Sequence, residues 1–330
     1  MQTGDQAINN KQKVLIIGYM DGFANSSKPA HIERFLAAHG YEVKILNTMF
    51  LSRLSDNGYK KFLPAVRPSL FLLYCLELIS YIQGRFLAFS RENTYYYLVV
   101  ARMRLRRKIV GPLLTGYDHI ICESSIDSLV FLDDMKETNT IYDCATPLAD
   151  ELYYGNELTI NQYSKFKNSE IKVYESVNHL SFHWKCYADY VKKYYKDTGN
   201  IFILDGGTDE PAAKAQYSSK PKIVYLGHLG GYWTNLPLLS KLSKTCDIDV
   251  YGSPAPPTEL GLNYKGYARP SVLADYQFGL ITLSQDRLRR EGFSAKHVEY
   301  LSYGLPVLVP DWRTSTKNMG GCDASGRPGA

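Results

Sequence analysis

The stretch Glu291–Pro310, EGFSAKHVEYLSYGLPVLVP, carries the clearest succession of structural signals in this 330-residue chain. Ser294 is a favourable helix N-cap residue. Glycine is a common helix terminator, and Gly304 lies two residues before the start of the apolar run Pro306–Val309. The pattern predicts a helix that begins after Ser294, ends at Gly304 and leads into a buried strand, which is typical of a sheet with parallel strands.

The same alternation of strands and helices extends outward from this stretch. Continuous apolar runs predict buried strands, and apolar residues that recur every three or four positions predict helices. The alternation predicts an α/β protein with two doubly wound, Rossmann-like domains whose parallel sheets face each other across a cleft. The expected elements are Lys13–Gly18, Pro29–His39, Tyr41–Leu46, His119–Cys122, Thr140–Tyr142, Leu180–Trp184, Cys186–Tyr195, Asn200–Leu204, Lys222–Leu226, Leu236–Leu242, Ile248–Tyr251 and Phe278–Leu283.

Four segments follow from this pattern. Residues 1–205 are predicted to form an N-terminal domain, 206–221 a linker of small and polar residues, and 222–311 a second domain with fewer elements. Residues 312–330 differ in composition from the rest of the chain. We interpret them as a non-native or disordered tail, and we expect the second domain to be incomplete and the natural protein to be longer.

Composition restricts the class of protein. Hydrophobic residues make up 45% of the chain and charged residues 22%, which argues against a disordered or fibrous protein. The net charge of +5 favours an anionic partner, whether phosphate, nucleotide or lipid headgroup. The six cysteines are widely spaced without a Cys-x-x-Cys pair, so we expect neither a zinc ribbon nor a disulfide framework. The polar beginning of the chain lacks a secretory signal pattern, and we expect a cytoplasmic protein.

Lys296 falls in the first turn of the helix predicted after Ser294. The positive end of the helix dipole disfavours a cation there unless an anion is bound, and the free amide groups of a helix start favour that anion. Glu299 lies three residues further along the same face, where its carboxylate could accept hydrogen bonds from two ribose hydroxyls. The pair predicts a nucleotide diphosphate site, and an ordinary surface pair at i, i+3 is the alternative.

The segment also contains a second carboxylate, Glu291, with seven residues between it and Glu299. This segment resembles the donor-binding signature of the GT-B glycosyltransferases, the group that includes the retaining Glu-x7-Glu enzymes. Other landmarks agree in order along the chain. Ile203–Asp209 is similar to the interdomain strand and turn of that group, Ile223–Leu229 to the first strand and loop of its C-terminal domain, and Ile141–Cys144 to a strand end that faces the acceptor.

The resemblance implies a GT-B fold and transfer of a sugar from a nucleotide diphosphate donor, with UDP expected as the nucleotide. The acceptor is expected to be a saccharide, carried on a lipid, in cell-surface polysaccharide or glycolipid synthesis. Glu291 would orient the hexose of the donor. The residues expected to hold the donor are Lys296, Glu299, Ser294, Gly227, His228 and Arg290.

Several positions depart from the pattern of that group. Asp205 replaces Asn in the interdomain turn, Ser294 follows Phe293 where Gly is usual, and the helix that returns to the first domain at the end of the fold has no counterpart. Retaining and inverting chemistry therefore both stay open. An inverting enzyme needs a general base for the acceptor hydroxyl, and Asp143 at a strand end is the candidate.

Other charged and polar groups have two interpretations each. Arg287 and Arg289 could meet the diphosphate beside Arg290, or belong to a solvated charge run. His179 and His183 have a helical spacing but no third ligand, so we expect no metal and no cofactor beyond the donor substrate. The loop after Gly18 resembles a dinucleotide-binding loop only loosely and is assigned to the acceptor side.

The basic cluster Arg102–Lys108 and the apolar run Leu70–Ile82 could hold the protein at an anionic membrane surface. The alternative is a solvated helix face over a buried core. No nucleic-acid-reading pattern is recognisable. Two other functions stay open: a nucleotide-sugar 2-epimerase of the same fold, and a truncated chain that binds nucleotide or membrane without turnover.

Overall fold

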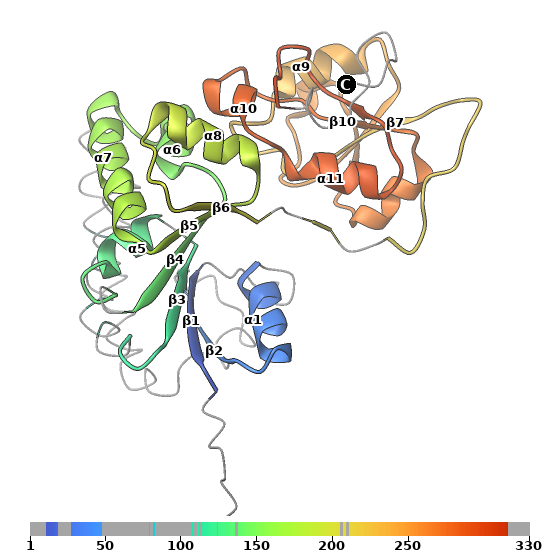
Figure 1. The fold of residues 1–330 in the computed structure, drawn as a ribbon. Coiled ribbons are helices and arrows are strands. Elements are labelled where there is room, and N and C mark those ends of the chain that lie inside the picture. Colours follow the sequence, from blue (N-terminus) through green and yellow to red (C-terminus); the bar gives the residue numbers. More distant parts are fainter. Residues whose placement is uncertain are drawn as a thin grey trace, which may run out of the picture. The chain divides into compact units, whose positions relative to one another are not determined.

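The computed structural model describes residues 11–18, 28–47, 114–123, 125–135, 138–204, 207–208 and 211–315, together with the single residues 79, 82, 107 and 111. The chain divides into two units, which are described separately (Figure 1). Unit 1 comprises Met1–Phe182 and Tyr195–Phe202, and unit 2 comprises His183–Tyr194 and Ile203–Ala330.

Unit 1 contains a six-stranded sheet of order β2-β1-β3-β4-β5-β6. The registered pairs from β2 to β5 are all parallel. Because β1 carries a continuous apolar sequence, it can be buried inside the sheet between β2 and β3, where Ile16 and Ile17 are fully buried. The strands are β1 (Lys13–Gly18), β2 (Glu42–Asn47), β3 (His119–Cys122), β4 (Asn139–Cys144), β5 (His179–Phe182) and β6 (Ile201–Ile203).

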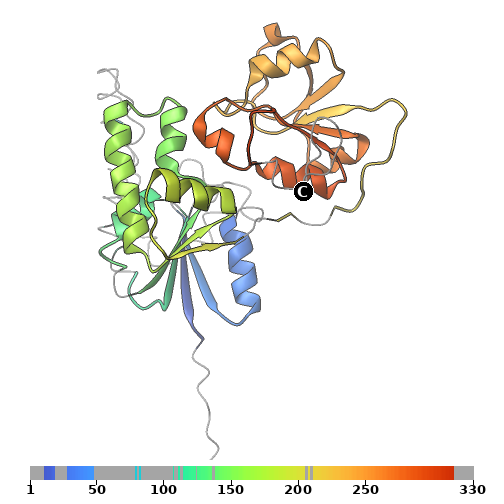
Figure 2. The ribbon, with the colours of Figure 1, turned by 45° about the horizontal axis from the view of Figure 1, so that its top comes forward.

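Helices lie on both faces of this sheet. The helix α1 (Lys28–Ala38) is on one face, and α5 (Ser125–Phe131) and α7 (Ile160–Ser176) are on the other (Figures 1 and 2). Thr159 and Gln162 form a capping box that fixes the start of α7. The buried Glu170 of α7 accepts hydrogen bonds from the amides of Leu148 and Ala149, which begin α6 (Leu148–Tyr154).

Unit 2 contains a five-stranded parallel sheet of order β11-β10-β7-β8-β9. Two apolar clusters cover its faces. One contains Leu239 of α9 (Leu236–Ser243), and the other contains Tyr300 of α11 (Ala295–Ser302). The strands are β7 (Ile223–Leu226), β8 (Ile248–Tyr251), β9 (Asn263–Gly266), β10 (Phe278–Leu280) and β11 (Val307–Leu308), and the other helices are α8 (Lys185–Tyr194), η4 (Thr258–Leu260), η5 (Pro270–Asp275) and α10 (Arg287–Glu291).

The predicted fold class, two doubly wound domains with parallel sheets, is confirmed. The unit boundaries differ from the predicted ones in three places. Helix α8, predicted within the first domain, packs in unit 2, where it contacts α10. Within the predicted linker, Ala215 packs against the core of unit 2 and donates its amide to the carbonyl of Tyr303. The predicted tail begins with packed residues, because Trp312 contacts that core and Arg313 is buried.

Several predicted features lie outside the described residues. They are the apolar run Leu70–Ile82 and the basic cluster Arg102–Lys108 apart from their single described positions, the loop that follows Gly18, the turn at Asp205 and Gly206, and the tail from residue 316. Within the described part of the chain, no helix combines the length and apolarity needed to cross a bilayer.

Candidate functional site

The carboxyl edge of the unit 2 sheet brings together residues from two distant segments. A doubly wound sheet binds ligands outside its strand ends at the point where the strand order reverses. In unit 2 this point lies between β7 and β10, because the chain runs from β7 to β8 and β9 on one side and then to β10 and β11 on the other. Gly227 directly follows β7, so it lies at this point.

Lys296, the second residue of α11, lies against Gly227. A β-carbon at position 227 would overlap Cε and Nζ of Lys296. Gly227 also has φ of 156°, a conformation that residues with side chains rarely adopt. The Nζ atom of Lys296 donates a hydrogen bond of 2.7 Å to the hydroxyl of Tyr225 on β7 and lies 4.2 Å from the centroid of that ring. The structure thus joins two of the predicted donor-site residues.

The start of α11 is open to an anion. Ser294 occupies the N-cap position, as predicted, but its side chain makes no capping hydrogen bond. Because the first amides of a helix have no intrahelical partner, a start without a side-chain cap leaves donors and the positive end of the dipole available. The ammonium of Lys296 belongs to the same turn, and the combination favours a phosphate group.

The loop of residues 227–234, which we call the glycine loop, connects β7 to α9. Its backbone is held by β8 and the residues after it: the amide of Gly227 donates to Tyr251 and that of Leu229 to Ser253. His228 is exposed, and its ring lies 5.8 Å from that of Trp233. Among the predicted donor-site residues, His228 is therefore accessible on the same loop as Gly227.

Glu299 is half-buried one turn further along α11. Burial raises the pKa of its carboxyl group above the ordinary value, and the charge of Lys296 opposes this rise. A carboxylate in such surroundings gains from hydrogen-bond donors, which the hydroxyls of a ribose would supply.

Glu291 and Arg290 end α10 and have different surroundings. The Glu291 carboxylate accepts a hydrogen bond of 2.5 Å from the Tyr194 hydroxyl and pairs with Lys193 at 3.2 Å, both on α8. The side chain of Arg290 is exposed, and its carbonyl accepts hydrogen bonds from Thr314. Glu291 is thus grouped with α8, whereas Gly227 and Lys296 form a separate group, and the predicted hexose-orienting role of Glu291 stays a prediction.

The other two arginines of α10 pack on aromatic rings. The guanidinium of Arg287 lies 4.3 Å from the centroid of the Tyr194 ring. That of Arg289 lies 5.4 Å from the Tyr232 ring and donates a 3.0 Å hydrogen bond to its hydroxyl. Arg289 therefore links α10 to the glycine loop, a role that neither sequence interpretation contained.

Asp143, the predicted base, is buried on β4 in unit 1. Its Oδ1 atom accepts a hydrogen bond of 2.6 Å from Ser181, and its Oδ2 atom pairs with the ammonium of Lys28 at the start of α1. Both oxygens are engaged, so accepting a proton from an acceptor hydroxyl would require one of these contacts to be exchanged.

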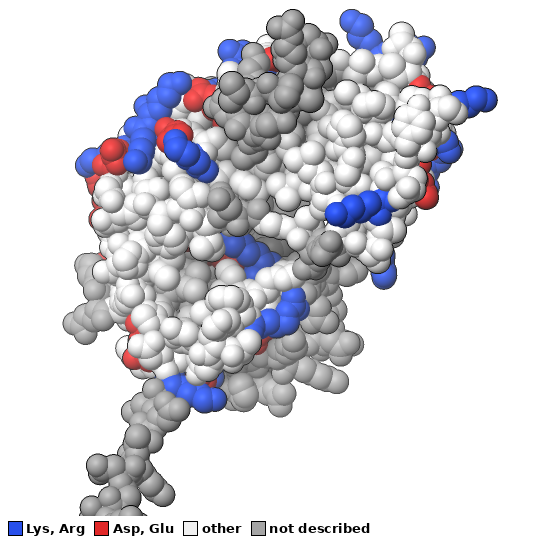
Figure 3. Space-filling model, turned by 45° about the vertical axis from the view of Figure 1, so that its right-hand side comes forward, with Lys and Arg blue, Asp and Glu red and all other residues white. Residues whose placement is uncertain are grey.

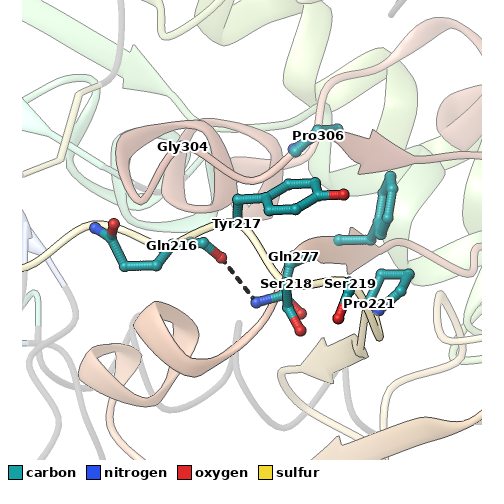
Figure 4. Close-up of a pocket in the computed structure, with 10 residues that line it drawn as sticks. Gln216, Tyr217, Ser218, Ser219, Pro221, Gln277, Gly304 and Pro306 are labelled. Carbon is teal, nitrogen blue, oxygen red and sulfur yellow. Dashed lines mark hydrogen bonds between the residues drawn. The ribbon is translucent and has the colours of Figure 1, made fainter.

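Two other features bear on ligands. Among the residues that the structure describes, no group of three or more His, Cys, Asp or Glu side chains is arranged to hold a metal ion. A cavity of about 390 Å³ lies at the opposite, amino edge of the unit 2 sheet, where residues such as Tyr217, Gln277 and Pro306 line it (Figure 4). Its lining carries no charged side chain.

On the face drawn in Figure 3, basic and acidic side chains of the described residues are interspersed.

The fold is similar to that of several solved glycosyltransferases. The apo form of the lipopolysaccharide outer core galactosyltransferase WaaB is 13% identical, with a TM-score of 0.58 over 93% of this chain and 83% of that one. Sucrose-phosphate synthase from Thermosynechococcus elongatus is 11% identical, with a TM-score of 0.58 over 91% and 81%. Anabaena Alr3699/HepE in complex with UDP-glucose is 11% identical, with a TM-score of 0.54 over 94% and 84%.

The chain has the GT-B fold. No protein-family model and no curated protein sequence matches it. This GT-B chain therefore shares an architecture with proteins to which its sequence is between 11% and 13% identical in these comparisons.

Sequence reasoning missed residues that hold the elements of the candidate site in place. Tyr225 contacts Lys296, and Arg313 donates a 3.0 Å hydrogen bond to the carbonyl of Gly292, just before α11. A signal existed for Tyr225, because a hydroxyl in the otherwise apolar run Ile223–Leu226 must find a hydrogen-bond partner when buried. No signal marked Arg313, which the composition of its neighbours assigned to a tail.

Proposed function

We propose that the protein is a glycosyltransferase that moves a sugar from a nucleotide diphosphate donor, a UDP-sugar, to a saccharide acceptor carried on a lipid. The contact between the Lys296 ammonium and Gly227, at the strand-order reversal of the unit 2 sheet and beside an open helix start, carries this proposal. The GT-B fold and the UDP-glucose complex of the similar Anabaena protein support it.

Catalysis in this proposal is positional and electrostatic. Negative charge grows on the diphosphate as the bond to the sugar breaks. Lys296 and the amides at the start of α11 would neutralise that charge, and fixed donors aimed at developing charge are an efficient source of rate acceleration. Glu299 would accept hydrogen bonds from the ribose, and His228 and Arg290 would lie near the donor. Asp143 would act as base only if the reaction inverts configuration.

A membrane location for the acceptor rests on the sequence of the basic cluster Arg102–Lys108. Basic residues near an anionic surface contribute about 1 kcal/mol each. Of the five in this cluster, Arg107 is paired with Asp134 at 2.7 Å, so the other four could hold the protein there reversibly. The acceptor would then be a saccharide on a lipid in cell-surface polysaccharide or glycolipid synthesis.

The test begins with a panel of nucleotide sugars. Each is mixed with the protein, thermal stabilisation is measured, and donors that stabilise are assayed for nucleotide release with saccharide acceptors. Lys296→Ala should lower turnover by about 100-fold or more, because it removes a charge that acts mainly in the transition state. The matched control is Lys244→Ala, a change of an exposed lysine in the same unit, which should leave turnover unaltered.

The outcomes separate the three candidate functions. Conversion of the donor sugar without an acceptor would indicate an epimerase and contradict the transferase. Nucleotide-sugar binding without any turnover would indicate a non-catalytic binding chain. Turnover that Lys296→Ala leaves unchanged would overturn the assignment of the donor site.

A further inference from the structure

Tyr225 is a buried tyrosine at the centre of the candidate donor site. It is the third residue of β7, its side chain is fully buried, and its hydroxyl has three neighbours. These are Nζ of Lys296 at 2.7 Å, Oγ1 of Thr234 at 3.2 Å and the carbonyl oxygen of His228 at 3.4 Å. The hydroxyl thus touches both α11 and the glycine loop.

The chemistry of the groups fixes the direction of the bond from Lys296, and it allows one direction for the bonds that follow. An ammonium group can only donate, so the oxygen of Tyr225 accepts from Lys296. The Thr234 hydroxyl donates to the carbonyl of His228 at 2.9 Å, which leaves its oxygen able to accept from Tyr225. The Tyr225 hydroxyl thus accepts from Lys296 and can donate either to Thr234 or directly to the carbonyl of His228, so in both cases it joins Lys296 to the glycine loop.

Two further contacts restrict the ammonium. The centroid of the Tyr225 ring lies 4.2 Å from Nζ, a distance at which a cation is attracted to the ring. Gly227 leaves open the space that Cε and Nζ of Lys296 occupy. A free lysine side chain carries rotamer entropy that an anion would have to overcome in ordering it. Here the protein orders the side chain beforehand.

We propose that Tyr225 is a positioning residue that holds the Lys296 ammonium at the carboxyl edge of β7 and couples its position to the glycine loop. This inference rests on the proposed function, since it assigns to Tyr225 a role in the reaction that Lys296 would serve. Tyr225 acts through Lys296 and is not itself expected to touch the donor.

The test is a double-mutant cycle. Tyr225→Phe keeps the ring and removes the hydroxyl, while Thr234 keeps its bond to the carbonyl of His228. We expect Tyr225→Phe to lower kcat about tenfold with a smaller change in the KM of the donor. The reason is that the Lys296 ammonium would no longer be held in place, and its position matters most when negative charge builds on the diphosphate. In a Lys296→Met background the same change should have no further effect, because no ammonium remains to be positioned.

A purely structural role of Tyr225 would give a different result, because kcat would then fall by the same factor in both backgrounds. The matched control is Tyr276→Phe, another buried tyrosine of unit 2, whose hydroxyl binds Asp249 and Tyr251. That variant should leave kcat and KM within about twofold of the parent. Unfolding followed by tryptophan fluorescence reports on unit 2 in each variant, since Trp184, Trp233 and Trp312 all belong to it.

Failure of this inference can be told from failure of the proposed function. If the parent protein neither binds UDP by calorimetry nor uses any nucleotide sugar, the proposed function fails. If the parent is active and Tyr225→Phe has the same kcat, the positioning role alone is overturned. If Tyr225→Phe does not fold, Thr234→Val removes the next link instead, and an unchanged kcat in that variant contradicts the coupling to the loop.

Discussion

The side chain of Lys296 occupies the space beside the α-carbon of Gly227 that a β-carbon would need. The two residues come from α11 and from the end of β7, and each alone is an ordinary feature of an α/β domain. Together they place a cation where the strand order reverses, next to a helix start that no side chain caps.

Gly227→Ala should therefore impair the site twice. The added methyl group displaces the Lys296 side chain, and φ of 156° strains any residue but glycine, by about 1–3 kcal/mol. We expect turnover to fall nearly as far as in Lys296→Ala, together with a lower free energy of unfolding of unit 2. Gly261→Ala is the matched control, since Gly261 has φ of 61° but open space around it. It should lose stability and keep its activity, and equal turnover in both variants would contradict the steric argument.

The role of Glu291 is separable from its ion pair. Glu291→Gln and Lys193→Met both remove the ion pair with α8, which is exposed and contributes little to stability. Only Glu291→Gln removes the carboxylate. If Glu291 orients the donor hexose, that variant alone should lose turnover, by about tenfold or more, when initial rates are compared. If the two variants have equal rates, the ion pair with Lys193 is the only role of Glu291 and the hexose-orienting role is contradicted.

A substitution of Arg313 tests whether the residues after position 311 belong to the folded part of unit 2. Its buried guanidinium donates to the carbonyl of Gly292, where the hydroxyl of Ser315 also donates at 2.7 Å. Arg313→Ala opens a cavity and removes a charged hydrogen bond, so we expect the free energy of unfolding to fall by about 2–4 kcal/mol in urea titrations. Arg269→Ala, at an exposed arginine, should change it by less than about 0.5 kcal/mol. Equal stability of the two variants would support the predicted tail.

His297 should make unit 2 sensitive to acid. Burial, with a further contribution from the charge of Arg313, lowers its pKa from 6.5 to about 4. Between these values the unfolded chain binds a proton that the folded chain does not. The contribution of His297 to stability is therefore complete above pH 6.5 and is lost progressively as the pH falls towards 4.

The measurement is the free energy of unfolding across this pH range, followed by tryptophan fluorescence. In His297→Leu the decline below pH 6.5 should be shallower than in the parent. A variant at an exposed histidine, His39→Gln, should decline as steeply as the parent. Parallel curves for the parent and His297→Leu would contradict the assignment.

Local pattern was sufficient for most of the fold. The helix predicted to begin after Ser294 is α11, Ala295–Ser302, and the run predicted from Lys222 is β7, Ile223–Leu226. Helix caps, helix-terminating glycines and apolar runs each involve only a few neighbouring residues, so they can be recognised in the sequence. The run Pro306–Val309 was predicted as a buried strand, but β11 is short and half-exposed because it lies at the edge of the sheet.

The amino-acid sequence by itself determined many of the strands and helices, although not α5, α6, α7, α10 or β9, and it pointed to Lys296, Gly227 and Glu299 as one candidate site. Only the tertiary structure decided the partners: Tyr225 with Lys296, α8 with Glu291, and Arg313 with the turn before α11. The reason is physical. Backbone propensity and periodicity depend on neighbours within a few residues, whereas the partner of a side chain depends on which distant elements pack beside it, and no local spacing encodes that choice.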